Sequence, residues 1–359
     1  MLNVRKAVSN LPSYHPPLGG RTGLRLDFNE NTVGCSPRVL ERLRNMGVEE
    51  LACYPEREPV EAIAAGHLNV KAEELLLTNG VDEAIHLICE AYLEAGDEVL
   101  IVVPTFSMYE IFAAAPGARI VNIPAGVNFS FPTNTILRHI TAATRLIAIA
   151  NPNNPTGSVA SLEELMLVAR SAPEAAILVD EAYFEFHGET LLGKWGEMPN
   201  LFVARTFSKA YGLAGLRAGV LMGDPQQMSG VRKVASPYNV NSVALACLPE
   251  ALDDDACVRS YVDAVCQGRE RLQEELQRLG IPFWPSRANF VLMRMGAANS
   301  AFIGRMRERG ILVRDRSRDP GCEGCVRITL GSMEQTERLL PVLREVLQEI
   351  GLVRQEVRP

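Results

Sequence analysis

Between residues 50 and 250, short and wholly apolar runs alternate with segments of helix length. Each run is followed by a turn residue and then by apolar residues at helical spacing. Strands that are apolar on both faces are typical of a mostly parallel sheet with helices on each side. We therefore predict an α/β fold with a large domain whose strands lie at residues 74–78, 98–103, 119–123, 145–150, 175–179, 201–204 and 218–222.

The pattern changes near residue 250, where longer helical segments replace the alternation. Residues 256–279 and 336–350 have apolar residues at helical spacing, and strand-like runs lie between them at 290–294, 311–313 and 326–330. A second, smaller α+β domain follows from this arrangement. We expect residues 1–45 to form an arm and part of the small domain, 46–250 the large domain, and 251–359 the small C-terminal domain.

Charge and hydropathy argue against several classes of partner. The chain has 36 basic and 43 acidic residues, a formal charge of −7, and no basic block that could neutralise a phosphate backbone. No apolar run approaches the roughly 20 residues of a membrane span, and the N-terminus has no secretory pattern. We expect a cytoplasmic protein with neither nucleic-acid nor membrane partners.

The chain has eight cysteines, most of them in apolar segments where a free thiol behaves as a small apolar side chain. Cys322 and Cys325 form a C-x-x-C pair, but the two further ligands that a zinc site requires are missing at matching spacing. We expect no disulfide framework, and neither a metal nor a redox role for this pair.

Lys209 lies in the segment RTFSKAYGLAGLR, between two strand-like runs. Its amine follows the hydroxyls of Thr206 and Ser208 and precedes Arg217 by eight residues. An amine can form an imine with an aldehyde, while hydroxyls and a guanidinium can bind a phosphate. A nearby positive charge also lowers the pKa of a lysine. The segment favours a site for an aldehyde cofactor with a phosphate; the alternative is a surface lysine in a glycine-rich turn.

Two further segments point to the same cofactor. Asp180 ends a buried apolar run, where a carboxylate is unfavourable unless paired, and a protonated pyridine nitrogen is a suitable partner. Asn154, in the turn NPNNPTG, can donate an amide hydrogen to a phenolate oxygen. Each has an ordinary alternative, a helix N-cap for Asp180 and a surface turn for Asn154. In combination with Lys209, they indicate pyridoxal 5′-phosphate.

The series NPNNPTG, VDEAYFEF and RTFSKAYGLAGLRAG resembles the fold type I pyridoxal-phosphate aminotransferases, most closely the histidinol-phosphate aminotransferases. The resemblance extends over nearly the whole chain, and its motifs are more specific for the cofactor than for the substrate. Further matching segments are LPSYHPP, DFNENT, CYPE, TNGVDEAI, PTFSMY, PYNVNS, GILVRD and GCVRITLG.

The resemblance implies a role for each residue around the cofactor. Lys209 would form the Schiff base and act as the base, Asp180 would pair with the pyridine nitrogen, and Tyr183 with Asn154 would contact the ring oxygen. Phe106 would stack on the ring. The phosphate would be bound by Gly80, Val81, Asp82, Thr206, Ser208 and Arg217, the first three at a helix N-terminus. For Asp82, a plain helix cap is an equally compatible interpretation.

This sequence departs from the family pattern at two places. The family usually has Tyr at the position of Phe106, and Gly-Ala-Asp where this chain has Gly80-Val81-Asp82. We expect these changes to alter local hydrogen bonding but not the class of reaction.

The resemblance also implies a homodimer with shared sites and an anion-binding substrate pocket. Tyr54 would reach the partner's cofactor phosphate, although packing at a domain edge is an alternative. Tyr14, Arg314 and Arg327 would hold the substrate phosphate, and Arg327 also a carboxylate. Arg314 lies in a mixed charge run that could instead be a solvated loop.

The implied activity is transamination between histidinol phosphate and 2-oxoglutarate, with glutamate as the amino donor in histidine biosynthesis. Aromatic amino-acid transamination and threonine-phosphate decarboxylation remain alternatives on the same skeleton. A cofactor-binding regulatory module is a different class, and we disfavour it because the N-terminal residues leave no room for a DNA-binding domain.

Overall fold

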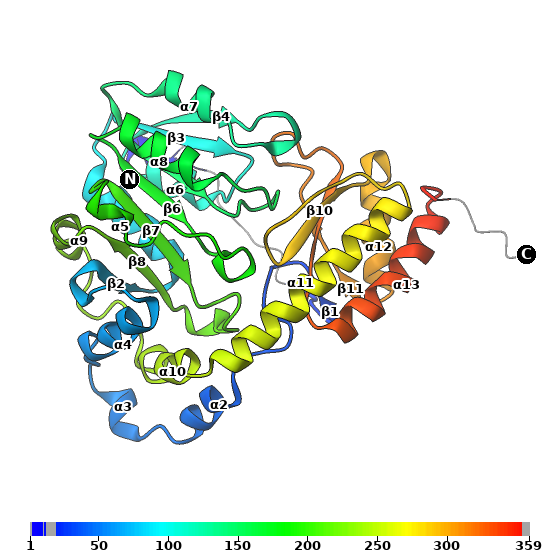
Figure 1. Ribbon diagram of the computed structural model, residues 1–359, viewed down its shortest axis with the longest axis horizontal. Helices are drawn as coiled ribbons and strands as arrows, with labels where there is room; N and C mark the ends of the chain where they lie inside the picture. Colours follow the sequence, from blue (N-terminus) through cyan, green and yellow to red (C-terminus); the bar gives the residue numbers. More distant parts are fainter. Residues whose placement is uncertain (1, 10, 12–18, 354–359) are drawn as a thin grey trace, which may run out of the picture.

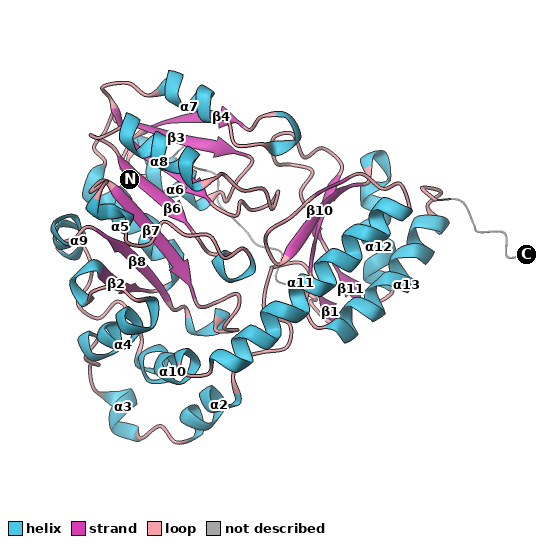
Figure 2. Ribbon diagram, viewed as in Figure 1, coloured by secondary structure: helices cyan, strands magenta, loops and turns pink. Residues whose placement is uncertain are grey.

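The computed structural model describes residues 2–9, 11 and 19–353. Within these residues the largest sheet has seven strands in the order β2-β8-β7-β6-β5-β3-β4 (Figure 2). β8 is antiparallel to both neighbours, and all other adjacent pairs are parallel. The strands are β2 (Leu75–Thr78), β3 (Glu98–Val103), β4 (Arg119–Pro124), β5 (Thr144–Ala150), β6 (Ala176–Asp180), β7 (Leu201–Thr206) and β8 (Gly219–Gly223).

The predicted strands are confirmed, and the packing explains why their sequences do not alternate. In β2, Leu75 and Leu77 pack into the core on one face of the sheet, whereas Leu76 packs into the core on the other face. Ile177 and Leu178 of β6 divide in the same way. Because both faces are covered, successive positions in these strands are apolar up to their last residues, Thr78 and Asp180.

Helices cover both faces of this sheet. The core on one face includes residues of α5 (Gly80–Tyr92), α6 (Met108–Ala114) and α9 (Pro225–Arg232). The opposite core receives α4 (Glu58–Leu68), α7 (Thr133–His139), α8 (Leu162–Ser171) and α10 (Ser242–Leu252). The α/β class is therefore confirmed, with a mostly parallel sheet between helical layers.

A smaller unit lies beyond α11 (Asp255–Arg278), which runs from α10 to the far side of the molecule in Figure 1. Its antiparallel sheet has the order β12-β13-β10-β9. α11 packs against α13, and α13 packs against α12. The bounds of the new elements are β9 (Phe283–Trp284), β10 (Phe290–Arg294), β12 (Arg314–Asp315), β13 (Cys325–Thr329), α12 (Asn299–Glu308) and α13 (Met333–Glu349).

The N-terminal segment joins this smaller unit through a separate pair of strands. β1 (Leu24–Arg25) pairs in parallel with β11 (Ile311–Leu312). The expected strand at 311–313 is therefore wrong in extent, because the chain changes sheets after Leu312 and re-enters as β12. The domain boundaries expected at residues 45 and 250 stay predictions.

Short elements complete the described part of the chain. Among residues 2–9, 11 and 19–353, no helix combines the length and the apolar character needed to cross a bilayer. The remaining helices are α1 (Lys6–Ser9), α2 (Pro37–Arg44) and α3 (Val48–Ala52), with 3-10 turns η1 (Ala72–Glu74), η2 (Val127–Phe129), η3 (Phe184–Phe186), η4 (Lys194–Gly196), η5 (Ala214–Leu216) and η6 (Gly296–Ala298).

Candidate active site

Polar side chains from both units meet at the carboxyl edge of the large sheet. Asp180 ends β6, Thr206 ends β7, and Lys209 follows shortly after. Arg327 approaches from β13 and donates a hydrogen bond through Nη1 to Asn154 Oδ1, in the turn after β5. Open α/β sheets bind ligands at this edge. The structure thus brings together the residues that the sequence had placed in three separate motifs.

Lys209 presents a buried amine with one hydrogen bond to the described part of the chain. Nζ donates to the backbone oxygen of Phe28, at 3.3 Å. Burial lowers the pKa of this amine to about 8, and the positive charges of Arg327 and Arg217 act in the same direction. The amine is consequently a better nucleophile and base near neutral pH than an exposed lysine.

Asp180 is 5 % exposed, and within the described residues no cationic side chain forms an ion pair with it. Tyr109 Oη donates to its Oδ2 at 2.5 Å, and the Ala182 amide donates to Oδ1 at 2.9 Å. Burial raises the pKa of Asp180 to about 6, although both hydrogen bonds favour the charged form. A protonated ring nitrogen would supply the missing positive charge.

Tyr183 is held by a buried chain of hydrogen bonds that begins in the N-terminal segment. Asn29 Nδ2 donates to Tyr183 Oη at 2.9 Å, and Thr329 Oγ1 donates to Asn29 Oδ1 at 3.0 Å. Asn29 has a φ of 56°, in the left-handed region that asparagine tolerates better than most residues. The phenol is therefore fixed by both the N-terminal segment and β13.

The start of α5 forms a cradle for an anion. Among the residues that the structure describes, no side chain caps this helix, so its first amides keep their hydrogens available for an anion. Gly80 has a φ of 75°, and a Cβ at this position would lie 2.6 Å from Arg217 Nη2. Arg217 also donates to Asp82 Oδ2 at 2.9 Å. The left-handed backbone therefore favours glycine at residue 80, whereas the guanidinium is the end of a flexible side chain that can move aside.

Two buried hydroxyl residues and a partly buried ring complete the surroundings of the cradle. Thr206 and Ser208 are 6 % and 5 % exposed, and Thr206 Oγ1 accepts a hydrogen bond from the Ser208 amide at 3.1 Å. Phe106 makes an edge-to-face contact with Tyr109, with ring centroids 5.9 Å apart. The predicted stacking residue thus packs against the phenol that holds Asp180.

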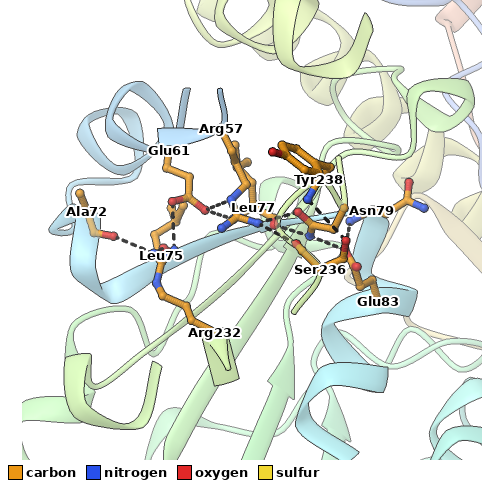
Figure 3. Close-up of polar contacts among 11 residues, drawn as sticks. Arg57, Glu61, Ala72, Leu75, Leu77, Asn79, Glu83, Arg232, Ser236 and Tyr238 are labelled. Carbon is orange, nitrogen blue, oxygen red and sulfur yellow. Dashed lines mark hydrogen bonds and ion pairs between the residues drawn. The ribbon is translucent and has the colours of Figure 1, made fainter. Parts of the chain in front are cut away.

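A polar network fixes the backbone that leads into the cradle (Figure 3). Glu83 accepts hydrogen bonds from the Asn79 amide at 2.5 Å and from Asn239 Nδ2 at 2.7 Å. Asn239 also donates to the Leu77 oxygen at 3.0 Å and accepts from Arg57 Nη1 at 2.7 Å. The last turn before α5 is therefore tied to the loop that follows α9.

The network continues on the other side of Arg57. Its Nε lies 3.0 Å from Glu61 Oε1, which also accepts from the Leu77 amide at 2.9 Å. Arg232 donates to Glu61 Oε2 at 3.1 Å and to the backbone oxygens of Ala72 and Leu75 (Figure 3). Glu61 is 3 % exposed and has two guanidinium partners, which offset its burial.

Tyr54 lies on the surface instead of in this site. Its exposed fraction is 79 %, and its ring stacks on Tyr238 with centroids 4.3 Å apart. Tyr238 is itself 53 % exposed. Such a pair presents aromatic surface to the outside of the chain.

The end of the site formed by the smaller unit carries guanidinium groups. Arg314 and Arg327 are directly opposite across β12 and β13. The guanidinium carbons of Arg314 and Arg21 lie 4.9 Å and 4.3 Å from the centroid of the Phe28 ring. Tyr14, the third residue expected here, lies outside the described residues.

Cys322 and Cys325 are buried free thiols that pack with Leu292. Among the residues that the structure describes, no group of three or more His, Cys, Asp or Glu side chains is placed to hold a metal ion. The pair forms part of a small apolar cluster beside Phe129 and Trp284.

Sequence reasoning missed Tyr109 and Asn29 as parts of the site. Both lie in segments that carried the family resemblance, PTFSMY and DFNENT, but neither was given a role. Their partners, Asp180 and Tyr183, are 71 and 154 positions away. The residues themselves gave no signal for pairing over such distances, which only the folded chain brings together.

The parts of this site define a class of protein. A weakly basic amine, a buried carboxylate without a cation and a cradle for an anion match the aldehyde, the pyridine nitrogen and the phosphate of pyridoxal 5′-phosphate. These features fit the chemistry of a pyridoxal-phosphate-dependent transaminase.

Comparison with known proteins gives the family. The model of the family "Aminotransferase class I and II" matches residues 22–343, and this chain belongs to that family. A histidinol-phosphate aminotransferase from a Geobacillus species is 35 % identical over 98 % of this chain and 100 % of its own length. Another, from Caldanaerobacter subterraneus, is 37 % identical over 90 % of this chain and 93 % of its own length.

A solved structure shows the same fold. The histidinol-phosphate aminotransferase from Sinorhizobium meliloti, in complex with pyridoxal-5′-phosphate, matches with a TM-score of 0.87 at 25 % identity. The match covers 98 % of this chain and 99 % of that chain. The expectation of a fold type I aminotransferase is confirmed.

Proposed function

We propose that this chain is a cytoplasmic enzyme of histidine biosynthesis that transfers an amino group from glutamate to imidazole-acetol phosphate, giving L-histidinol phosphate and 2-oxoglutarate. The observation that carries the proposal is the pairing of Arg314 with Arg327 at the substrate end of the site. Two guanidiniums there suit a substrate with a phosphate at its distal end. Relatives named for this activity cover nearly the whole chain.

Lys209 is the residue that moves the proton. When bound, pyridoxal 5′-phosphate withdraws electrons from the substrate α-carbon, which makes the α-proton acidic. With its pKa lowered to about 8, the Lys209 amine can accept that proton. The same amine would then deliver the proton to C4′, the cofactor carbon that is bonded to the transferred nitrogen. The same amine would link covalently to the cofactor aldehyde between turnovers.

The surrounding residues hold the reacting groups in place. Asp180 would keep the ring nitrogen protonated, with Tyr109 fixing the orientation of its carboxylate. Tyr183 and Asn154 would donate to the ring oxygen, and Phe106 would stack on the ring. The phosphate would be bound by the amides and side chains of Gly80, Val81, Asp82, Thr206, Ser208 and Arg217.

Arg327 would serve both half-reactions. Its guanidinium already donates to Asn154 and, at 2.9 Å, to the Asp27 backbone oxygen, so its plane is fixed before a substrate arrives. A fixed guanidinium can bind the carboxylate of glutamate or the phosphate of histidinol phosphate. Tyr14 stays a predicted partner in this pocket.

We further propose that the chain works as a homodimer in which Tyr54 reaches the cofactor phosphate of the partner. Support comes from an exposed apolar surface on α3 and the nearby loops. Val48, Leu51, Tyr54 and Tyr238 are 84 %, 61 %, 79 % and 53 % exposed. Patches of this kind mark protein interfaces.

Absorbance of the purified enzyme during a single half-reaction tests the activity. Histidinol phosphate, phenylalanine and threonine phosphate are added separately, and we expect conversion of the cofactor to its amine form with histidinol phosphate. Lys209→Ala should keep the cofactor but lose turnover. A response to phenylalanine alone would point to an aromatic aminotransferase, and release of carbon dioxide from threonine phosphate would point to a decarboxylase.

A further inference from the structure

Three arginine side chains, those of Arg314, Arg316 and Arg327, lie on the same face of the smaller sheet. Arg314 is directly opposite Arg327. The antiparallel pairing with β13 continues one residue past β12, because the Arg316 amide donates to the Cys325 backbone oxygen at 3.0 Å. Residues two apart on an extended strand share a face, so the side chains of Arg314 and Arg316 lie on the side that also carries Arg327.

The positive charge of this group is only partly balanced. In the described part of the chain, the one ion pair that these three arginines make joins Arg316 Nη2 to Asp319. Arg314 covers the Phe28 ring, and Arg327 donates to uncharged oxygens. Like charges opposite each other in a ladder are unfavourable. The arrangement therefore suits a ligand that brings more than one negative charge.

Each of the three side chains also has a buried nitrogen without a hydrogen-bond partner among the described residues. These nitrogens are Arg314 Nη1, Arg316 Nε and Arg327 Nε. A buried donor without an acceptor is unfavourable, and a bound oxygen would relieve it. The Arg316 side chain is 15 % exposed, and next to burial its charge is the largest influence that lowers the pKa of Arg327. Arg316 thus lies close to the substrate end of the site.

We propose that Arg316 is a third anion-binding residue of the substrate site, which makes the enzyme prefer a phosphomonoester dianion to a distal carboxylate or an uncharged ring. This inference rests on the proposed function and assigns a specificity residue to it. Arg316 Nε would donate to a phosphate oxygen, while Asp319 holds the guanidinium through Nη2. A phosphate dianion offers three oxygens, and its two negative charges together with that of Asp319 balance the three guanidiniums.

Arg316→Gln and Arg318→Gln form a matched pair for the test. Arg318 is two residues away, is exposed and loses the same charge on substitution. In single-turnover experiments we expect Arg316→Gln to lower kcat/KM for histidinol phosphate by on the order of tenfold to a hundredfold. The half-reaction with glutamate should change by no more than about twofold, and Arg318→Gln should leave both half-reactions near wild type.

Arg316→Lys separates charge from geometry, because lysine keeps the charge but has no Nε donor. We expect an intermediate kcat/KM for histidinol phosphate; full activity of this variant would overturn the role of Nε. Equal losses in both half-reactions, or no loss in Arg316→Gln, would overturn the proposal. A normal glutamate half-reaction in Arg316→Gln shows that the variant is folded.

Inorganic phosphate distinguishes failure of this inference from failure of the proposed function. Phosphate should compete with glutamate in the wild type, and Arg316→Gln should raise its inhibition constant by roughly tenfold. If histidinol phosphate does not react but this competition and its loss persist, the proposed substrate is wrong and the anion site stands. If phosphate inhibits both proteins equally, Arg316 is not part of an anion site.

Discussion

Asp180 shows how a single side chain can oppose folding and support function. Its carboxylate is almost fully buried, and its hydrogen bonds come from the neutral groups of Tyr109 and Ala182. Burial raises the pKa from 3.8 to about 6, which corresponds to roughly 3 kcal/mol against ionisation in the folded state. Because the folded-state pKa lies above the unfolded one, ionisation of Asp180 lowers the free energy of unfolding. The protein avoids this loss below about pH 4, where the carboxyl is protonated, and suffers it in full once the pH has risen through about 6.

We predict that Asp180→Asn stabilises the cofactor-free protein at pH 8, because the ionised carboxylate is gone. The gain should be about 1–3 kcal/mol, with the lower value if Tyr109 loses its acceptor. Transamination should fall by on the order of a hundredfold or more. Urea unfolding at pH 5 and pH 8 checks the first part, since the gain should shrink at the lower pH. A gain of the same size at both would contradict the assignment.

Local chemistry made part of the site predictable. Lys209, Asp180 and Arg217 stand beside strand ends and turns in patterns that already indicate a cofactor, and the structure brings them to one edge. Tyr109 and Asn29 act through partners far along the chain, and their own sequence surroundings are those of ordinary helix and turn residues. Their roles depend on the register of the whole fold.

The start of α5 depends on elements that do not touch a ligand. Asn239 donates to both Leu77 and Glu83, and Glu83 in turn accepts from the Asn79 amide. The last turn before the cradle is therefore held from the loop after α9. Loss of that support should loosen the backbone of Gly80.

We predict that Asn239→Ala weakens binding of pyridoxal 5′-phosphate by roughly tenfold, equivalent to one lost hydrogen bond. Binding of pyridoxal, which has no phosphate, should change much less. Asn200→Ala is the control, since Asn200 donates to three backbone oxygens elsewhere in the chain. It should lower stability without changing cofactor affinity. Equal weakening of both ligands by Asn239→Ala would show a general structural effect.

At the level of elements, the sequence is most informative where a strand is buried on both faces. Each of the predicted runs in the large sheet is a strand, but nothing in them indicates that β8 is antiparallel to both neighbours. The short strands of the smaller unit are harder still. Val313 separates β11 from β12, and the two belong to different sheets although they are almost adjacent in sequence.

On the surface of the molecule, the exposed rings of Tyr54 and Tyr238 lie beside the polar network that fixes the start of α5. Tyr54 stacks on Tyr238, and Arg57, three residues later, joins the network through Asn239. α3 and α10 also contact each other near this surface. A partner subunit bound to this surface would therefore contact residues whose hydrogen bonds hold the backbone before α5.

Mixing two inactive variants tests the proposed shared site. Tyr54→Ala and Lys209→Ala should each have little activity, but a mixed dimer would contain one site with an intact lysine and an intact tyrosine. We predict that unfolding and refolding the two together restores partial activity, while either alone does not recover. Light scattering should show a dimer for each variant before unfolding and for the mixture after refolding, and Tyr238→Phe should stay active. An active monomer, or no recovery from the mixture, would contradict the shared site.

Residues 24–31 lie between the two units and form hydrogen bonds with both of them. Leu24 and Arg25 pair with β11, Asn29 reaches both Tyr183 and Thr329, and Asn31 Nδ2 donates to the Ala210 oxygen at 3.0 Å. A protease cut or a bulky fusion at this point would leave the large sheet intact yet release the phenol of Tyr183 and one strand of the smaller unit together.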